Sequence, residues 1–163
     1  MVSMCVYRQL VIFFSLIGIG LSLYAFYIET RKSTDPTYRA ACDLSESMSC
    51  SRVLTSRWAR GFGLFSSDSI FNLPTSIFAL IYYCLSLLFN LSYQSKGIAR
   101  LRVLFSVLTN CGSVYLGYVL YFILKDFCFI CFGMYIVNFM LLISNWRLLN
   151  QTRKINNRKQ KKQ

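Results

Sequence analysis

Four long apolar runs, none of which contains a charged side chain, constrain this chain more than any other feature. They cover roughly residues 10–28, 76–93, 103–124 and 127–146. A helix needs about 20 mostly apolar residues to cross the hydrocarbon core of a bilayer, and each run is close to that length. Since the chain has 163 residues, little remains for a second domain. We therefore predict an all-α membrane protein, a four-transmembrane-helix bundle that forms a single domain over residues 1–163.

The first run leaves one alternative open. A cleaved signal peptide also carries an apolar stretch, but that stretch has only about 7–15 residues and precedes a small-residue cleavage site. Residues 10–28 are longer than this, and no clear A-x-A pattern follows them. We favour a retained transmembrane helix, with cleavage as the alternative.

Positive charge is distributed unevenly between the segments that join the runs. Residues 1–9, 94–102 and 147–163 hold eleven Lys and Arg and no Asp or Glu, whereas 29–75 and 125–126 hold seven Lys and Arg and all six acids. Cytosolic segments of membrane proteins carry the excess of Lys and Arg. We therefore expect both termini and the basic tail 147–163 to be cytosolic, and the long loop 29–75 to be lumenal.

The net charge of +12 does not predict a nucleic-acid partner, because its excess lies next to the expected membrane spans. The last five residues, KQKKQ, match a K-x-K-x-x retrieval signal of endoplasmic reticulum membrane proteins. An ordinary positive-inside tail explains them equally well. We predict a multi-pass protein of the endoplasmic reticulum membrane.

The chain has no histidine, which excludes imidazole bases, Ser-His-Asp triads and His-ligated metals. Its six carboxylates also disfavour a hydrolase that depends on two of them. Seven cysteines remain as the main reactive side chains. The composition therefore favours thiol chemistry.

Four of the cysteines form two pairs on the expected lumenal side. Cys42 and Cys50 lie in the long loop, and Cys128 and Cys131 form a C-x-x-C motif at the start of the fourth run. The lumen is oxidising, so disulfides persist there. A separation of three places Cys128 and Cys131 on one face of a helix start, where the pKa of a thiol falls and the reactive thiolate is favoured. We expect these two to exchange electrons with a lipid-soluble oxidant.

Two other readings of the same cysteines stay open. All four could bind zinc, although the spacing between Cys42 and Cys50 fits zinc ligands poorly, and we expect no metal. Alternatively, both pairs could be structural disulfides. Cys5, Cys84 and Cys111 are interpreted as packing residues.

The loop between the first two runs contains an amphipathic stretch at residues 51–65. Its apolar side chains recur at helical spacing. They are Leu54, Trp58, Phe62 and Phe65. We predict that this stretch lies flat on the membrane interface as part of a lumenal cap loop that closes an apolar pocket and carries Cys42 and Cys50 near Cys128. A surface loop with aromatic anchors is the alternative.

Short motifs follow one another in order along nearly the whole chain. They are CD at 42–43, SCSRV at 49–53, SRW at 56–58, RGFGL at 60–64, DSI at 68–70, SIF at 76–78, GSVYL at 112–116, and DFC at 126–128 with Cys131 and Tyr135. Together they resemble the vitamin K epoxide reductase family, in its animal endoplasmic reticulum type without a fused thioredoxin domain.

The resemblance implies a four-helix bundle around a quinone pocket, with no bound cofactor and a required thiol reductant. It implies reduction of vitamin K 2,3-epoxide to the quinone and of the quinone to the hydroquinone. Cys128 and Cys131 would be the catalytic pair, with Cys131 nearest the substrate. Cys42 and Cys50 would be the electron shuttle that a thioredoxin-like lumenal oxidoreductase reduces.

The resemblance also assigns a substrate site. The substrate-binding residues would be Tyr135, Thr75, Asn72, Trp58 and Phe78. Thr75 stands where vertebrate members of the family have asparagine, and the segment between Leu64 and Asp68 is shorter than theirs. Both departures bear on epoxide preference and coumarin sensitivity rather than on the thiols.

Two other functions remain compatible with these residues. The same relay could serve disulfide formation in lumenal proteins, with a quinone as the electron acceptor, because relative potentials set the direction. A non-enzymatic tetraspan scaffold with structural disulfides is the second alternative.

Overall fold

Helices form nearly all of the computed structural model, which describes residues 2–43, 48–63, 73–91 and 96–160. The long helices are α1 (Val2–Thr34), α3 (Thr75–Leu91), α4 (Lys96–Tyr118), which continues as a π-helical segment η3 (Val119–Leu124), and α5 (Phe129–Gln160). The short ones are α2 (Cys50–Leu54), η1 (Arg57–Ala59) and η2 (Gly61–Gly63). The prediction of an all-α fold is confirmed for the described residues, which contain no strand.

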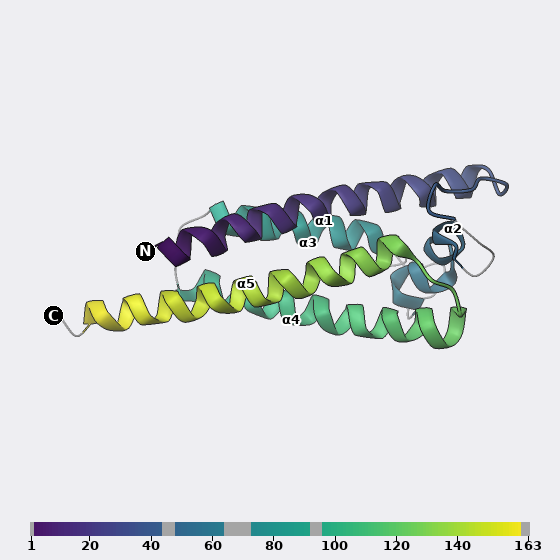
Figure 1. The fold of residues 1–163 in the computed structure, drawn as a ribbon. Coiled ribbons are helices and arrows are strands. Elements are labelled where there is room, and N and C mark those ends of the chain that lie inside the picture. The colour runs from purple at the N-terminus through teal and green to yellow at the C-terminus, as the bar shows by residue number, and fades with distance from the viewer. Residues whose placement is uncertain (1, 44–47, 64–72, 92–95, 161–163) are drawn as a thin grey trace.

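The four long helices lie side by side along a common direction (Figure 1). α1 packs against α3 and α5, and α4 packs against α5. Both ends of the chain lie at one end of this bundle, and α2 lies at the other (Figure 1). We call these the terminal end and the α2 end.

Three of the long helices contain segments that are long and apolar enough to cross a membrane. These segments are Met4–Thr34, Gly97–Leu124 and Phe129–Ile155. α3 is also apolar but has only 17 residues. Large apolar side chains such as Phe13, Leu88, Val114 and Tyr121 are exposed on the outside of the bundle. Such a surface suits contact with lipid, so the protein is a membrane protein.

Small residues line the face of α1 that packs on the bundle. Ser15, Gly18, Ser22 and Ala25 recur at intervals of three and four, and all are buried. Small side chains let membrane helices approach closely. At Gly18 the approach is tight, because an added Cβ would lie 2.5 Å from the ring of Tyr83 on α3. This position therefore requires glycine.

The first helix extends further than its apolar run. We expected the loop to begin at residue 29, but α1 continues to Thr34. Glu29 continues the buried stripe four residues after Ala25 and is only 7% exposed. Arg31 and Lys32 lie in the last turn, where positive charge suits the helix dipole. Glu29 is thus a residue of the bundle and not of the loop.

Arg102, counted in the sequence among the cations of the cytosolic segments, is buried, with only 3% of its surface exposed. Its Nη2 donates to Oδ1 of Asn90 (3.1 Å) and Oδ1 of Asn145 (2.9 Å). The amide of Asn90 donates in turn to the backbone carbonyl of Arg8 (2.9 Å). We call these four residues the polar clamp. The amide oxygens of neighbouring helices let the guanidinium lie inside the bundle.

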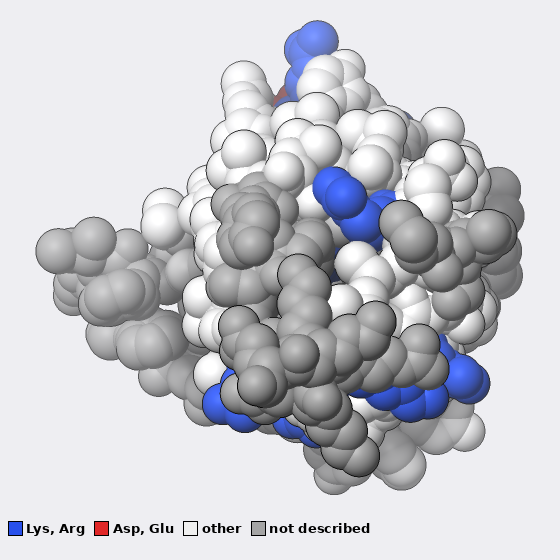
Figure 2. All heavy atoms as spheres, turned by 90° about the vertical axis from the view of Figure 1, so that its left-hand side faces the viewer, with Lys and Arg blue, Asp and Glu red and all other residues white. Residues whose placement is uncertain are grey.

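The terminal end of the bundle carries many positively charged side chains, as Figure 2 shows. Arg100, Arg147, Arg153 and Lys154 are exposed. The chain has no acidic residue in 1–28, 73–124 or 127–163. The predicted charge asymmetry therefore separates the two ends of the fold in space.

The amphipathic stretch is not one helix, so that prediction is wrong over residues 51–63. α2, η1 and η2 are separate short turns. α2 ends at Leu54, and the extended backbone of Ser56 and Arg60 breaks the helical path. Gly61 and Gly63 then turn the chain with left-handed backbone angles (φ 54° and 69°). Leu54, expected on a flat membrane-facing surface, is instead buried against the bundle. Phe65 lies outside the described residues.

Candidate functional site

A disulfide joins Cys42 to Cys50 at the α2 end. Cys50 is the first residue of α2, and the side chain of Ser49 caps this helix by accepting a hydrogen bond from the backbone N–H of Arg52 (3.3 Å).

Asp43 holds the disulfide loop in shape. Its carboxylate accepts hydrogen bonds from the backbone N–H of Ala40 (2.9 Å), from the N–H (3.0 Å) and hydroxyl (2.6 Å) of Ser51, and from the hydroxyl of Ser49 (3.1 Å). Burial raises the pKa of Asp43, but these hydrogen bonds lower it more, so the pKa lies below its usual range. Asp43 therefore stays charged and fixes the segments on both sides of the disulfide.

Cys128 and Cys131 lie where the chain enters α5. The turn before them reverses at Lys125, whose φ of 53° is left-handed. Cys128 stands immediately before Phe129, the first residue of α5, and its carbonyl accepts from the N–H of Phe132 (3.0 Å). The N–H of Cys131 points back to the Cys128 sulfur (3.3 Å). Both thiols are free, and they lie close together at the start of the helix.

The surroundings of Cys128 favour its thiolate. A hydrogen bond from the Cys131 thiol lowers its pKa most, burial raises it, and the N–H groups of Cys131 and Ile130 lower it further. The net pKa lies below that of an ordinary thiol. Hydrogen bonds to the charged form and the helix start explain the direction.

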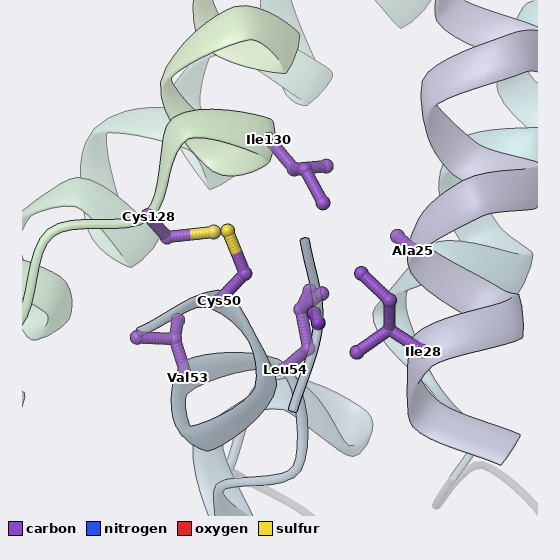
Figure 3. Close-up of a cluster of buried hydrophobic side chains, with 8 residues drawn as sticks. Ala25, Ile28, Cys50, Val53, Leu54, Cys128 and Ile130 are labelled. Carbon is purple, nitrogen blue, oxygen red and sulfur yellow. The ribbon is translucent and has the colours of Figure 1, made fainter. Parts of the chain in front are cut away.

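The disulfide and the thiol pair meet at the α2 end. Cys50 and Cys128 are both fully buried in one apolar cluster. Their sulfur atoms point toward one another in Figure 3. An ion pair between Arg52 and Asp126 (Nε–Oδ2 3.3 Å) holds α2 against the turn before α5. The arrangement suits thiol exchange, which passes through a mixed disulfide.

An apolar cavity of about 290 Å³ lies next to Cys131, within the bundle. Of the predicted substrate residues, Thr75, Phe78 and Tyr135 line it together with Cys131. A smaller hollow of about 50 Å³ adjoins Cys131 and Tyr135 and is lined by Trp58. Trp58 thus faces this hollow and is not among the residues that line the main cavity. Asn72 lies outside the described residues.

Sequence reasoning missed several polar groups of the cavity wall. The hydroxyl of Tyr83 donates to Oδ1 of Asn138 (2.8 Å), and Nδ2 of Asn138 donates to the hydroxyl of Ser113 (2.8 Å). This network joins α3, α5 and α4 beside the cavity. A polar amide in the middle of an apolar run was the available signal for Asn138, because uncompensated polar groups are costly in lipid.

Ser76 and Glu29 are a second polar pair that sequence reasoning missed. Ser76 lines the cavity, and its hydroxyl donates a hydrogen bond to Oε2 of Glu29 on α1. The spacing of Glu29 from Ser22 and Ala25 was the available signal, because it continues the buried face of the helix.

The fold and the site define a helical membrane oxidoreductase with cysteine pairs beside an apolar cavity. Residues 9–146 match the model of the Vitamin K epoxide reductase family. Vitamin K epoxide reductase complex subunit 1 of Mus musculus is 40% identical over 136 residues, which cover 81% of this chain and 84% of that protein. The Rattus norvegicus protein of the same name is 38% identical with the same coverage. The chain belongs to the vitamin K epoxide reductase family.

Proposed function

We propose that this protein reduces vitamin K 2,3-epoxide to the quinone, and the quinone to the hydroquinone, with electrons from thiols. The single observation that carries the proposal is the free Cys131 thiol on the wall of an apolar cavity of about 290 Å³. The cavity offers apolar side chains for a fused ring system and a few polar groups for its oxygens, as small-molecule sites do. The names of the two relatives support the same substrate.

In this proposal each cysteine pair has its own task. Cys128 and Cys131 are the catalytic pair, and Cys131 meets the substrate. Cys42 and Cys50 form the electron shuttle, which a thioredoxin-like lumenal oxidoreductase reduces. Electrons pass through a transient disulfide between Cys50 and Cys128, and the apposition of these two sulfur atoms in Figure 3 supports that step.

Substrate oxygens would be held by hydroxyl groups in an otherwise apolar site. Tyr135 and Thr75 are the proposed donors, and Phe78 would pack on the ring system; their place on the cavity wall supports this. Trp58 would close the smaller hollow beside them. Asn72 remains a candidate on the resemblance alone.

We further propose that residues 1–163 form one domain of the endoplasmic reticulum membrane, with four transmembrane helices and cytosolic termini. The unequal charge of the two ends supports this orientation. The predicted cap loop 29–75, shortened by α1 and α3 to residues 35–74, would lie on the lumenal side, and the packing of Leu54 against the bundle supports its role as a cap. The reaction needs a thiol reductant and no bound cofactor.

Purified full-length protein in lipid nanodiscs tests the proposal. It is incubated with a dithiol and vitamin K epoxide or quinone, and the products are separated by chromatography. We expect quinone from the epoxide, hydroquinone from the quinone, and loss of both in Cys131→Ala but not in Cys84→Ala. Disulfides that stay oxidised under every condition, with no product, would support the scaffold alternative instead.

A further inference from the structure

We propose that Glu29 delivers a proton to the substrate through the hydroxyl of Ser76. The inference rests on the proposed quinone reduction and adds a proton source to it. Glu29 places a carboxyl group inside an apolar helix bundle, where such groups are rare. Ionisable groups inside membrane helices are costly and are commonly functional.

The carboxyl group of Glu29 is buried and only partly satisfied. Its side chain is 7% exposed. Oε2 accepts the hydrogen bond from Ser76, whereas Oε1 is buried with no hydrogen-bond partner among the described residues. A buried polar atom without a partner destabilises the fold. The second oxygen therefore has capacity for a proton or for a passing water molecule.

Glu29 and Ser76 together connect two separate spaces. Ser76 is 3% exposed and lines the cavity that also contains Cys131. Glu29 lines a different hollow, of about 370 Å³, at the α2 end. Exposed Ser33 and Pro36 form part of the wall of that hollow, so it reaches the surface. Leu54 lines both spaces and separates them.

The charges around Glu29 suit a group that releases and regains a proton. Lys32, on the same helix, and Arg60 line the hollow with it. The charge of Arg60 stabilises the carboxylate that remains after release, whereas the ammonium of Lys32 donates to the backbone carbonyl of Tyr38 (2.8 Å). On the cavity side the thiol of Cys131 is close enough to interact electrostatically with Glu29, and the hydroxyls of Tyr82, Tyr83 and Tyr135 line the same cavity.

Reduction of a quinone to a hydroquinone consumes two electrons and two protons. Oxidation of Cys128 and Cys131 to a disulfide supplies both electrons. When Cys128 reacts as the thiolate, the pair releases one proton, from Cys131, so the second must come from elsewhere. When Glu29 is protonated, its carboxyl O–H donates to the Ser76 oxygen, which reverses the hydrogen bond seen between them, and the Ser76 O–H turns toward the cavity. Ser76 then passes its hydroxyl proton to the substrate oxygen and takes the proton of Glu29. The resulting carboxylate is reprotonated by water from the hollow.

A glutamine in place of Glu29 keeps the shape and the hydrogen bond but cannot release a proton. We expect Glu29→Gln to slow hydroquinone formation at least tenfold and to change its pH profile. The solvent deuterium isotope effect on the remaining rate should increase. Asp35→Asn, which removes an exposed acid a short distance along the chain, is the matched control and should behave as wild type.

A second oxidant separates proton delivery from a structural role. Glutathione disulfide also oxidises Cys128 and Cys131, but this exchange delivers no proton to a quinone oxygen. We expect Glu29→Gln to react with it at the wild-type rate. Ser76→Ala should resemble Glu29→Gln in both reactions, and Ser76→Thr, which keeps a hydroxyl, should recover most of the quinone activity.

Formate offers a rescue test. It is small enough to enter the hollow of about 370 Å³ and to replace the missing carboxyl group in Glu29→Ala. Restored quinone reduction is the expected result. Glu29→Gln with the wild-type rate and pH profile would overturn the proposal, as would an equal loss in the quinone and glutathione reactions. Absence of turnover in the wild type would instead refute the proposed function.

Discussion

At the scale of single residues, Tyr135 lies one helical turn after Cys131, and both line the cavity. If its hydroxyl donates to a substrate oxygen, removing it should cost about 1–3 kcal/mol of transition-state stabilisation. We expect Tyr135→Phe to lower kcat/KM roughly five- to hundredfold without a change in Tm. Tyr121→Phe, on the outside of the bundle, is the control. Unchanged kinetics in Tyr135→Phe would remove Tyr135 from the site.

The thiolate of Cys128 gives a second prediction at this scale. Because the pKa of Cys128 lies below that of an ordinary thiol, its thiolate persists to a lower pH and is lost as the pH falls through the lowered pKa. A small methylthiolating reagent should therefore modify Cys128 at a lower pH than Cys84. Mass spectrometry measures both in one sample.

Cys131→Ala tests the cause of this shift. It removes the hydrogen bond that lowers the pKa of Cys128 most, so the pH midpoint of Cys128 modification should rise. Cys131→Ser keeps a hydroxyl donor and should retain part of the effect. An unchanged midpoint in Cys131→Ala would mean that the helix start and the backbone N–H groups determine the reactivity of Cys128.

At the scale of the helices, two glycines of α1 provide a matched pair. A Cβ at Gly18 would meet the Tyr83 ring at 2.5 Å, whereas a Cβ at Gly20 has nothing within 4 Å. We expect Gly18→Ala to lower the free energy of unfolding by about 1–3 kcal/mol, as overpacking does. Gly20→Ala should be neutral or raise it by up to about 1 kcal/mol. Thermal unfolding in detergent measures both, and equal stability of the two variants would contradict the close approach of α1 and α3.

The sequence predicted the helices better than their ends. Apolar runs place α1, α3, α4 and α5, because burial in lipid demands uninterrupted apolar residues. The ends depend on other forces: α1 continues through Glu29, whose Oε2 accepts a hydrogen bond from a serine of another helix. Likewise, α5 continues to Gln160 through polar residues that leave no apolar signal.

The same limit applies to the site. The motifs located the cysteines and Tyr135, since short-range spacing places them on one helix. The burial of Arg102 depends on amides from two other helices, which no local pattern reveals. The break in residues 51–63 begins at the extended backbone of Ser56 and continues at Arg60, neither of which the apolar spacing reveals.

At the scale of the whole molecule, the orientation in the membrane can be tested by glycosylation. Asn90 and Asn150 each begin an N-x-S/T sequon. We expect both to remain unmodified, because they lie at the terminal end, which we place in the cytosol. Asn90 is also fully buried. A sequon engineered at exposed Thr37 should be glycosylated. A glycan on natural Asn150, detected by a gel shift and its removal, would reverse the orientation.

The relay also belongs to the whole molecule, because it joins both cysteine pairs. A small dithiol can reduce Cys128–Cys131 directly, so it should restore turnover in Cys42→Ala and largely in Cys50→Ala. It should not restore Cys128→Ala or Cys131→Ala.

With a thioredoxin-like protein as the reductant, all four of these variants should be inactive or nearly so. Cys5→Ala, Cys84→Ala and Cys111→Ala should stay active in both assays. Full dithiol-driven turnover by Cys131→Ala would contradict the mechanism.

The polar clamp has a consequence for how the chain is made. An arginine at the centre of a membrane helix opposes insertion by roughly 2.5–3.5 kcal/mol, and by less near an end. Arg102 of α4 bonds to Asn90 at the end of α3, only a short connection earlier in the chain. Integrated alone, α4 would present that guanidinium to lipid. If α3 and α4 leave the translocon as a hairpin, the side-chain amide of Asn90 already bonds the guanidinium of Arg102 when both enter the lipid. Biogenesis should therefore favour release of the two helices as a pair.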